Sequence, residues 1–213
     1  MDEKTINVLL VDDHVIVRSG VQVMLESDSD IRVTGQAESA QEALELLKNA
    51  SFDVALIDIS LPGRNGIELL KILRTDYPRL AVLKLSAYSE DIYAIRAIRY
   101  GASGYLTKDC PAGRLIAAVK TAAVGGKSIS PSVGEKLADM VSGKTGEGFE
   151  TLSDREIEVL KLIAKGVGLK EIASALHLSP HTITTYRARI LRKTGINGNA
   201  NLAIFAKEAG LIN

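Results

Sequence analysis

The sequence has little cysteine, no long hydrophobic run and no net charge. Cys110 is the single cysteine among 213 residues, which rules out an intramolecular disulfide and a cysteine-based metal cage. No apolar stretch approaches the roughly 20 residues that a helix needs to span a bilayer. The first residues also lack the pattern of a signal peptide. We therefore expect a cytoplasmic protein without a membrane partner.

The missing net charge hides an uneven distribution along the chain. Lysine and arginine together number 26, as do aspartate and glutamate. Residues 1–124 hold 14 basic and 17 acidic side chains, whereas residues 151–213 hold 9 basic and 5 acidic ones. An acidic front part and a basic rear part predict two modules with different partners.

Strand-like and helix-like segments alternate five times in residues 1–124. Short apolar runs predict the strands, and apolar residues at helical spacing follow each of them. The pattern is typical of an α/β fold, a doubly wound, flavodoxin-like parallel sheet with helices on both faces. The predicted strands are Ile6–Val11, Ile31–Ala37, Val54–Ile57, Ala81–Leu85 and Tyr105–Thr107.

Polar side chains follow the carboxyl ends of four of these strands. They are Asp12 and Asp13, Asp58, Ser86 and Lys108. Because parallel strands end at one edge of the sheet, we expect these side chains to converge there. Converging carboxylates repel one another unless a cation holds them, and oxygen ligands suit Mg²⁺. The sequence therefore predicts a Mg²⁺ site formed by Asp12, Asp13 and Asp58, with His14 as a surface or capping residue outside it.

One carboxylate of this group is also placed to accept a phosphoryl group. We expect Asp58 to be the nucleophile, because it ends a central strand, while Asp12 and Asp13 are adjacent and better placed to share the ion. Ser86 would donate a hydrogen bond to a phosphoryl oxygen, and Lys108 would pair with its charge. Taken singly, Asp58 could cap a loop, Ser86 could begin a helix and Lys108 could be a solvated surface charge. Their combination favours the phosphoryl site.

Residues 125–150 join the two modules. Glycines interrupt this segment, and one short apolar pattern predicts a helix within it. A joint that lets the modules dock and separate explains the composition, and so does an inert spacer.

Residues 151–213 predict a small all-α module that contains a helix-turn-helix. Ser153 and Glu156 have the spacing of a capping box, and a second helix is expected at 170–176. A tight turn then leads to a third helix that begins at Pro180. Its outward face suits contacts with base edges and phosphates in a major groove, although a basic helix can also be merely solvated. The expected DNA contacts are Thr184, Thr185, Ala188, Arg189, Arg192 and Lys193.

The motifs of both modules resemble those of known families. The first module resembles the receiver domain of two-component response regulators. It does so through Val-Asp-Asp-His at 11–14, Asp-Ile-Ser-Leu-Pro-Gly-Arg-Asn-Gly at 58–66, Leu-Ser-Ala at 85–87 and Gly-Tyr-Leu-Thr-Lys at 104–108. The second resembles the LuxR-type DNA-binding domain through Leu-Ser-Asp-Arg-Glu-Ile-Glu-Val-Leu at 152–160, Lys-Glu-Ile-Ala at 170–173, Leu-Ser-Pro-His-Thr-Ile at 178–183 and Tyr-Arg-Ala-Arg-Ile at 186–190. The combination is similar to the NarL/FixJ group of response regulators.

This resemblance implies a set of roles and partners. A sensor histidine kinase would phosphorylate Asp58, and the main-chain carbonyl of Ser60 would join Asp13 and Asp58 on Mg²⁺. Ser86 and Tyr105 would form the switch pair. The activated protein would then form a homodimer on double-stranded promoter DNA and regulate transcription, with RNA polymerase as a further partner.

Two other functions would account for part of the sequence. A phosphatase of the haloacid-dehalogenase type would also use an acidic pocket, but it needs an Asp-x-Asp pair, and residue 60 is serine. We therefore expect a phosphoryl acceptor and not a turnover enzyme. The other rival is a DNA-binding regulator that ignores phosphate and responds to a protein or small molecule. The acidic pocket argues against it.

Overall fold

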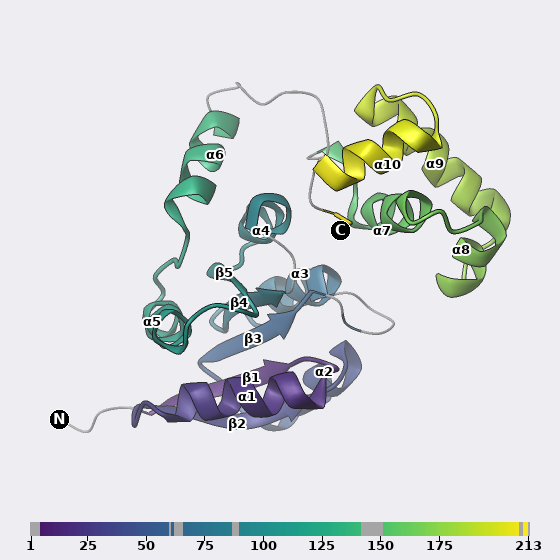
Figure 1. Ribbon diagram of the computed structural model, residues 1–213. Coiled ribbons are helices and arrows are strands. Elements are labelled where there is room, and N and C mark those ends of the chain that lie inside the picture. Colours follow the sequence, from purple (N-terminus) through teal and green to yellow (C-terminus); the bar gives the residue numbers. More distant parts are fainter. Residues whose placement is uncertain are drawn as a thin grey trace. The chain divides into compact units, whose positions relative to one another are not determined.

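The computed structural model describes residues 5–59, 61, 66–86, 90–141, 151–208 and 211–212. The chain divides into two compact units, Met1–Leu137 and Ala138–Asn213 (Figure 1). Among the described helices, none is both long enough and apolar enough to cross a membrane.

The first unit is a five-stranded parallel sheet with helices on both faces, as predicted. The strand order is β2-β1-β3-β4-β5, which places the strand that ends in Asp58 at the centre. The strands are β1 (Ile6–Val11), β2 (Ile31–Ala37), β3 (Val54–Asp58), β4 (Ala81–Ser86) and β5 (Gly104–Thr107). The helices are α1 (Val15–Glu26), α2 (Ala40–Asn49), α3 (Gly66–Asp76), α4 (Glu90–Arg99) and α5 (Ala112–Ala123).

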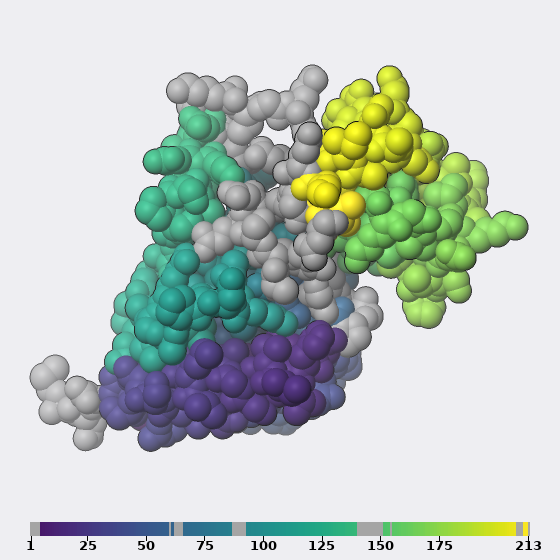
Figure 2. Space-filling view, viewed as in Figure 1, coloured from purple at the N-terminus to yellow at the C-terminus, as the bar shows by residue number. Residues whose placement is uncertain are grey.

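The central strands are covered on both faces. Every residue of β3 and β4 is buried, because α1 and α5 pack against one face of the sheet and other helices cover the opposite face. Helix α1 lies at the surface of this unit (Figure 2, purple). Lys84 is among the buried residues of β4. It is the one charged residue of this strand, whose other residues are apolar except for Ser86 at its end.

The segment after α5 packs against the edge of the sheet. Ser128 forms an isolated parallel bridge with Gly104 of β5, and its main-chain N–H donates to the Ser103 carbonyl over 2.7 Å. A side chain at Gly104 would collide with the Ser128 carbonyl, so glycine is needed for this approach. Helix α6 (Pro131–Val141) follows. The boundary between the two compact units lies between Leu137 and Ala138, within α6 and within the segment 125–150 that we predicted as a linker.

Four described helices lie wholly within the second unit. They are α7 (Asp154–Ala164), α8 (Leu169–Ala175), α9 (Pro180–Thr194) and α10 (Asn199–Glu208), the last drawn in yellow in Figures 1 and 2. Helix α7 packs against α8, α9 and α10, and α8 packs against α9. The turn between α8 and α9 includes His177, whose φ of 53° is left-handed. Helix, turn and helix form the predicted helix-turn-helix.

A carboxylate inside this unit joins the start of α7 to the end of α9. Glu156 is 2% exposed, and its Oε2 accepts a hydrogen bond from the Ser153 main-chain N–H over 2.6 Å. The Ser153 hydroxyl in turn accepts from the Glu156 N–H, which confirms the predicted capping box. Lys193 Nζ lies 2.7 Å from the same Oε2 atom. Burial raises the pKa of Glu156, but the bonds from Lys193 and Ser153 outweigh it and lower the pKa overall.

Replacing Glu156 by glutamine should therefore destabilise the second unit in a pH-dependent way. Loss of the charged hydrogen bonds should cost about 1.5–3 kcal/mol of unfolding free energy at neutral pH. Because the folded state holds the pKa of Glu156 below its ordinary 4.5, this stabilisation is present above that pH and fades as pH falls through the folded-state value. Calorimetric unfolding of the full chain between neutral and acidic pH measures the difference.

Glu171→Gln is the matched control for this experiment. Glu171 also bonds to the start of its own helix, through the Gly168 N–H at 3.3 Å, but this carboxylate is exposed. Its replacement should cost far less than that of Glu156. Equal losses in the two variants, or a loss at Glu156 that stays constant with pH, would contradict the role of the buried pair.

Candidate functional site

The acidic strand ends come together at one edge of the sheet, as predicted. One ligand atom from each of Asp12, Asp13, His14 and Asp58 lies within 4.8 Å of the others. His14 stands closer to this group than we expected, since its Nδ1 lies 2.8 Å from Asp13 Oδ1, although its side chain is 63% exposed. The convergence follows from the parallel order of β1 and β3, which lie side by side in the sheet.

The Asp58 carboxylate is buried and held from two sides. It is 3% exposed, its Oδ1 accepts a hydrogen bond from the Ile59 N–H over 2.7 Å, and its Oδ2 lies 3.0 Å from Lys108 Nζ. The same ammonium lies 2.6 Å from Asp12 Oδ2. Burial acts to lower the pKa of Lys108, but its hydrogen bonds to Asp12 and Asp58 raise the pKa above its ordinary value. Lys108 is thus a fixed positive charge between two carboxylates.

The carboxylate oxygens of this group fit a hard cation. Asp12 Oδ2 is buried 2.6 Å from Lys108 Nζ, and Asp13 Oδ1 is buried 2.8 Å from His14 Nδ1, so three carboxylates share one ammonium and one imidazole. Oxygen ligands of this kind suit Mg²⁺, the ion that receiver domains bind at such a pocket. Ser60, whose carbonyl we predicted as a further ligand, lies outside the described residues.

Two buried basic side chains donate hydrogen bonds to the main chain of this pocket, and neither was predicted from the sequence. Arg18 on α1 donates to the main-chain carbonyl of Asp12 over 2.5 Å. Lys84 on β4 donates to the main-chain carbonyl of Asp58 over 2.9 Å. Burial lowers the pKa of Lys84 to about 7, and the charge of Asp58 offsets this only in part. A lone lysine inside an apolar strand was the signal that could have found Lys84.

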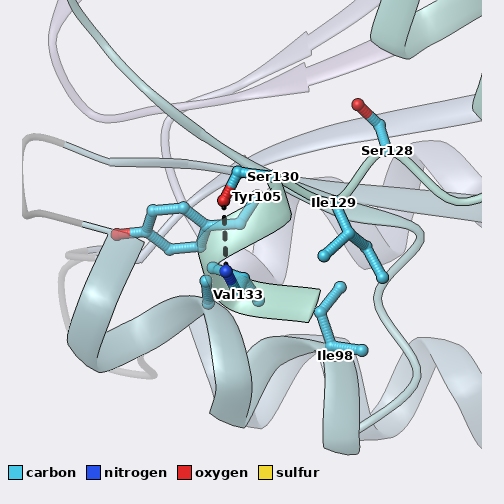
Figure 3. A pocket seen from close by; sticks show the side chains of 7 residues that line it. Ile98, Tyr105, Ser128, Ile129, Ser130 and Val133 are labelled. Carbon is cyan, nitrogen blue, oxygen red and sulfur yellow. Dashed lines mark hydrogen bonds between the residues drawn. The ribbon is translucent and has the colours of Figure 1, made fainter. Parts of the chain in front are cut away.

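The two predicted switch residues are both buried in the first unit. Ser86 is fully buried at the end of β4, and its carbonyl accepts the Lys108 N–H over 2.8 Å. Tyr105 is 4% exposed on β5 and lines a small pocket together with Ser130, just before α6, and Val133, in the first turn of α6 (Figure 3). The Ser130 hydroxyl accepts the Val133 N–H over 3.4 Å and so begins that helix. The pocket is thus lined both by β5 and by the start of α6.

The third helix of the second unit presents its polar face to solvent. Its inner face is fixed by Ile183 and Ile190, both fully buried. Ser179 caps the helix by accepting the Thr182 N–H over 3.1 Å, and Pro180 occupies the first helical position. Most of the residues that we expected to contact DNA are exposed, and Thr185 is partly exposed. The exposed ones are Thr184, Ala188, Arg189 and Arg192.

Hydrogen bonds within the unit modify three of these predicted contacts. Thr184 and Thr185 donate their hydroxyl protons to carbonyls one turn earlier in the helix, over 3.0 and 3.1 Å, so each hydroxyl keeps only its acceptor capacity for DNA. Lys193 is paired with Glu156 and only 32% exposed, whereas we expected it to contact DNA. The sequence could not show this pair, because the two residues lie 37 positions apart.

Comparison with known proteins agrees with both parts of this geometry. Residues 8–120 match the response regulator receiver domain, and residues 150–206 match bacterial regulatory proteins of the luxR family. Response regulator UvrY of Escherichia coli (strain K12) is 32% identical over 210 residues, which cover 98% of this chain and 96% of UvrY.

Solved structures of RcsB, one of them from Salmonella enterica serovar Typhimurium, are similar to this chain over 96% of its length. RcsB bound to promoter rprA in the presence of the phosphomimetic BeF₃⁻ is 26% identical with a TM-score of 0.71, covering 96% of this chain and 99% of that one. A structure of two RcsB dimers bound to two parallel DNAs is 26% identical with a TM-score of 0.60, covering 96% and 98%. With its receiver and LuxR-type modules, the chain belongs to the NarL/FixJ group of response regulators, the phosphorylation-controlled transcription regulators of two-component systems.

Proposed function

We propose that Asp58 is the phosphoryl acceptor of this regulator and that a sensor histidine kinase is the donor. The observation that carries the proposal is the position of the Asp58 carboxylate, buried at the end of the central strand with Lys108 3.0 Å from its Oδ2. In the transfer, a carboxylate oxygen forms a bond to phosphorus while the bond from phosphorus to the kinase histidine nitrogen breaks. That nitrogen keeps the electron pair.

Asp12, Asp13, Asp58 and the carbonyl of Ser60 are the proposed ligands of Mg²⁺. When bound, the ion supplies positive charge for the phosphoryl oxygens. The three carboxylates gathered within 4.8 Å of one another support this assignment, since the single ammonium of Lys108 does not balance their charge. Lys108, already between Asp12 and Asp58, would pair with a phosphoryl oxygen after transfer.

The signal would leave the pocket through Ser86 and Tyr105. The Ser86 hydroxyl would donate to a phosphoryl oxygen, and the end of β4 would move with it. Tyr105 lies on the neighbouring strand and lines the same small pocket as Ser130 and Val133, so a change in its ring position would alter the surroundings of the start of α6. This shared pocket supports a switching role for the joining segment over that of an inert spacer.

The second unit would carry the output, binding of double-stranded promoter DNA as a homodimer. The exposed polar face of α9 supports this role, with Thr184, Thr185 and Ala188 near base edges and Arg189 and Arg192 near bases and phosphates. RcsB, bound to promoter DNA and present as dimers on DNA, supports it by similarity. We place Lys193 at the edge of this surface. RNA polymerase is a proposed further partner, and the cytoplasm the proposed location.

The proposed domain boundaries are 1–124 for the receiver, 125–150 for the linker and 151–213 for the DNA-binding domain. The matches at residues 8–120 and 150–206 support them. We further propose that the protein is not a turnover enzyme. Serine at position 60 supports this, because an Asp-x-Asp phosphatase pair would need a second carboxylate there.

Replacing Asp58 by asparagine should abolish phosphate incorporation. The amide keeps the shape of the side chain but lacks the nucleophilic oxygen, so acetyl phosphate with Mg²⁺ should leave the variant unlabelled. Mass spectrometry of the intact protein measures the added mass. Asp76→Asn, an exposed aspartate at the end of α3, is the control that should be labelled like the wild type. Labelling of the Asp58→Asn variant would show that another group accepts the phosphate.

Replacing Arg192 by alanine should weaken promoter binding by removing a phosphate contact. Binding should fall similarly on all DNA sequences, and the slope of log affinity against log salt should decrease by about 1. Lys165→Ala removes the same charge from an exposed position at the end of α7 and is the matched control. Fluorescence anisotropy at several salt concentrations measures both. An equal loss in the two variants would mean that only net charge matters and that the face of α9 has no special role.

A further inference from the structure

We infer that Lys84 is a positioning residue for phosphoryl transfer at Asp58, acting through the peptide group that follows this aspartate. The inference rests on the proposed role of Asp58 and adds to it a side chain that never touches the phosphoryl group. It starts from a single contact, the 2.9 Å hydrogen bond from Lys84 Nζ to the main-chain carbonyl of Asp58.

One peptide plane connects Lys84 to the reactive carboxylate. The carbonyl of Asp58 and the N–H of Ile59 belong to the same planar group, so they turn together. Lys84 holds the carbonyl, while the N–H on the other side of the plane donates to Asp58 Oδ1 over 2.7 Å. Fixing the plane therefore fixes Oδ1. The other oxygen, Oδ2, is then left facing Lys108.

The residues around Lys84 leave space for this hydrogen bond and exclude water from it. The side chain is fully buried, and burying an ammonium group is unfavourable unless it is well paired. Gly66, the first residue of α3, leaves the necessary space, because a Cβ there would collide with both the Asp58 carbonyl and Lys84 Nζ. The Gly66 N–H also donates to the Ile59 carbonyl over 2.9 Å, which fixes the next peptide as well.

The neighbouring strand has the same arrangement. Arg18 is buried and donates to the main-chain carbonyl of Asp12, just as Lys84 donates to that of Asp58. In both cases a buried basic side chain bonds to the backbone of the aspartate and leaves its carboxylate oxygens to the pocket, and Arg18 also pairs with Glu38 over 2.5 Å. The role of Lys84 is therefore to orient the acceptor, and a small misplacement of a reacting group is enough to slow its reaction strongly.

The test compares Lys84→Met, Lys84→Gln and wild type in the full chain. Methionine keeps length and packing but has no donor, whereas glutamine keeps an N–H donor without the charge. The first-order rate of Asp58 phosphorylation is measured at saturating acetyl phosphate and Mg²⁺, together with the acetyl phosphate concentration that gives half-maximal rate. Lys84→Met should be slower by about tenfold or more with little change in that concentration, and Lys84→Gln should regain most of the rate.

Val82→Ala separates positioning from general destabilisation. Val82 is fully buried on the same face of β4, two residues earlier, and its truncation should lower the melting temperature without slowing phosphorylation. Slowing in this variant to the extent seen in Lys84→Met would overturn the inference, as would a wild-type rate in Lys84→Met.

If circular dichroism shows that Lys84→Met does not fold, the phosphorylation rate of Lys84→Gln becomes the test. A rate of Lys84→Gln below about one tenth of the wild-type rate would overturn the inference. A wild type that acetyl phosphate does not label at Asp58 would overturn the proposed function as well, whereas labelled wild type with unaffected Lys84 variants would overturn the inference alone.

Discussion

The structure of the first unit depends on negative charge gathered at one edge of its sheet. Parallel order brings the ends of β1 and β3 together, so the carboxylates of Asp12 and Asp58 must share a small buried space. Lys108 stands between them at 2.6 and 3.0 Å and offsets part of their repulsion. The negative charge that Lys108 does not offset favours a cation at this edge. A phosphoryl group on Asp58 would add negative charge to the same place, and a change of local charge is what a switch of this kind uses.

The second unit depends on a different use of charge. Here the buried carboxylate of Glu156 is fully paired, with the start of its own helix and with Lys193. This pairing joins the start of α7 to the end of α9. Exposed arginines on the outer face of α9 carry the positive charge that DNA would meet. The first unit thus leaves part of the negative charge of its aspartates without a basic partner, whereas the second unit pairs its buried Glu156 and so holds its helices together.

The sequence predicted what depends on local pattern. Apolar runs located the strands, and the parallel topology then brought Asp12, Asp13 and Asp58 to one edge, because a strand end is visible in the sequence. Pairs formed by distant residues were not predictable. Lys84 meets the Asp58 carbonyl across 26 positions, and Lys193 meets Glu156 across 37. Neither contact leaves a periodic signal, and the charged side chains involved are usually exposed.

The most direct test of the account is the affinity of the full chain for promoter DNA at one fixed salt concentration, before and after incubation with Mg²⁺ and acetyl phosphate. Salt is fixed because phosphate contacts make affinity strongly salt-dependent. If phosphorylation of Asp58 controls DNA binding, affinity rises in step with the fraction of Asp58 that mass spectrometry finds modified. Modified Asp58 with unchanged affinity would contradict the coupling between the two units, and with it the central claim.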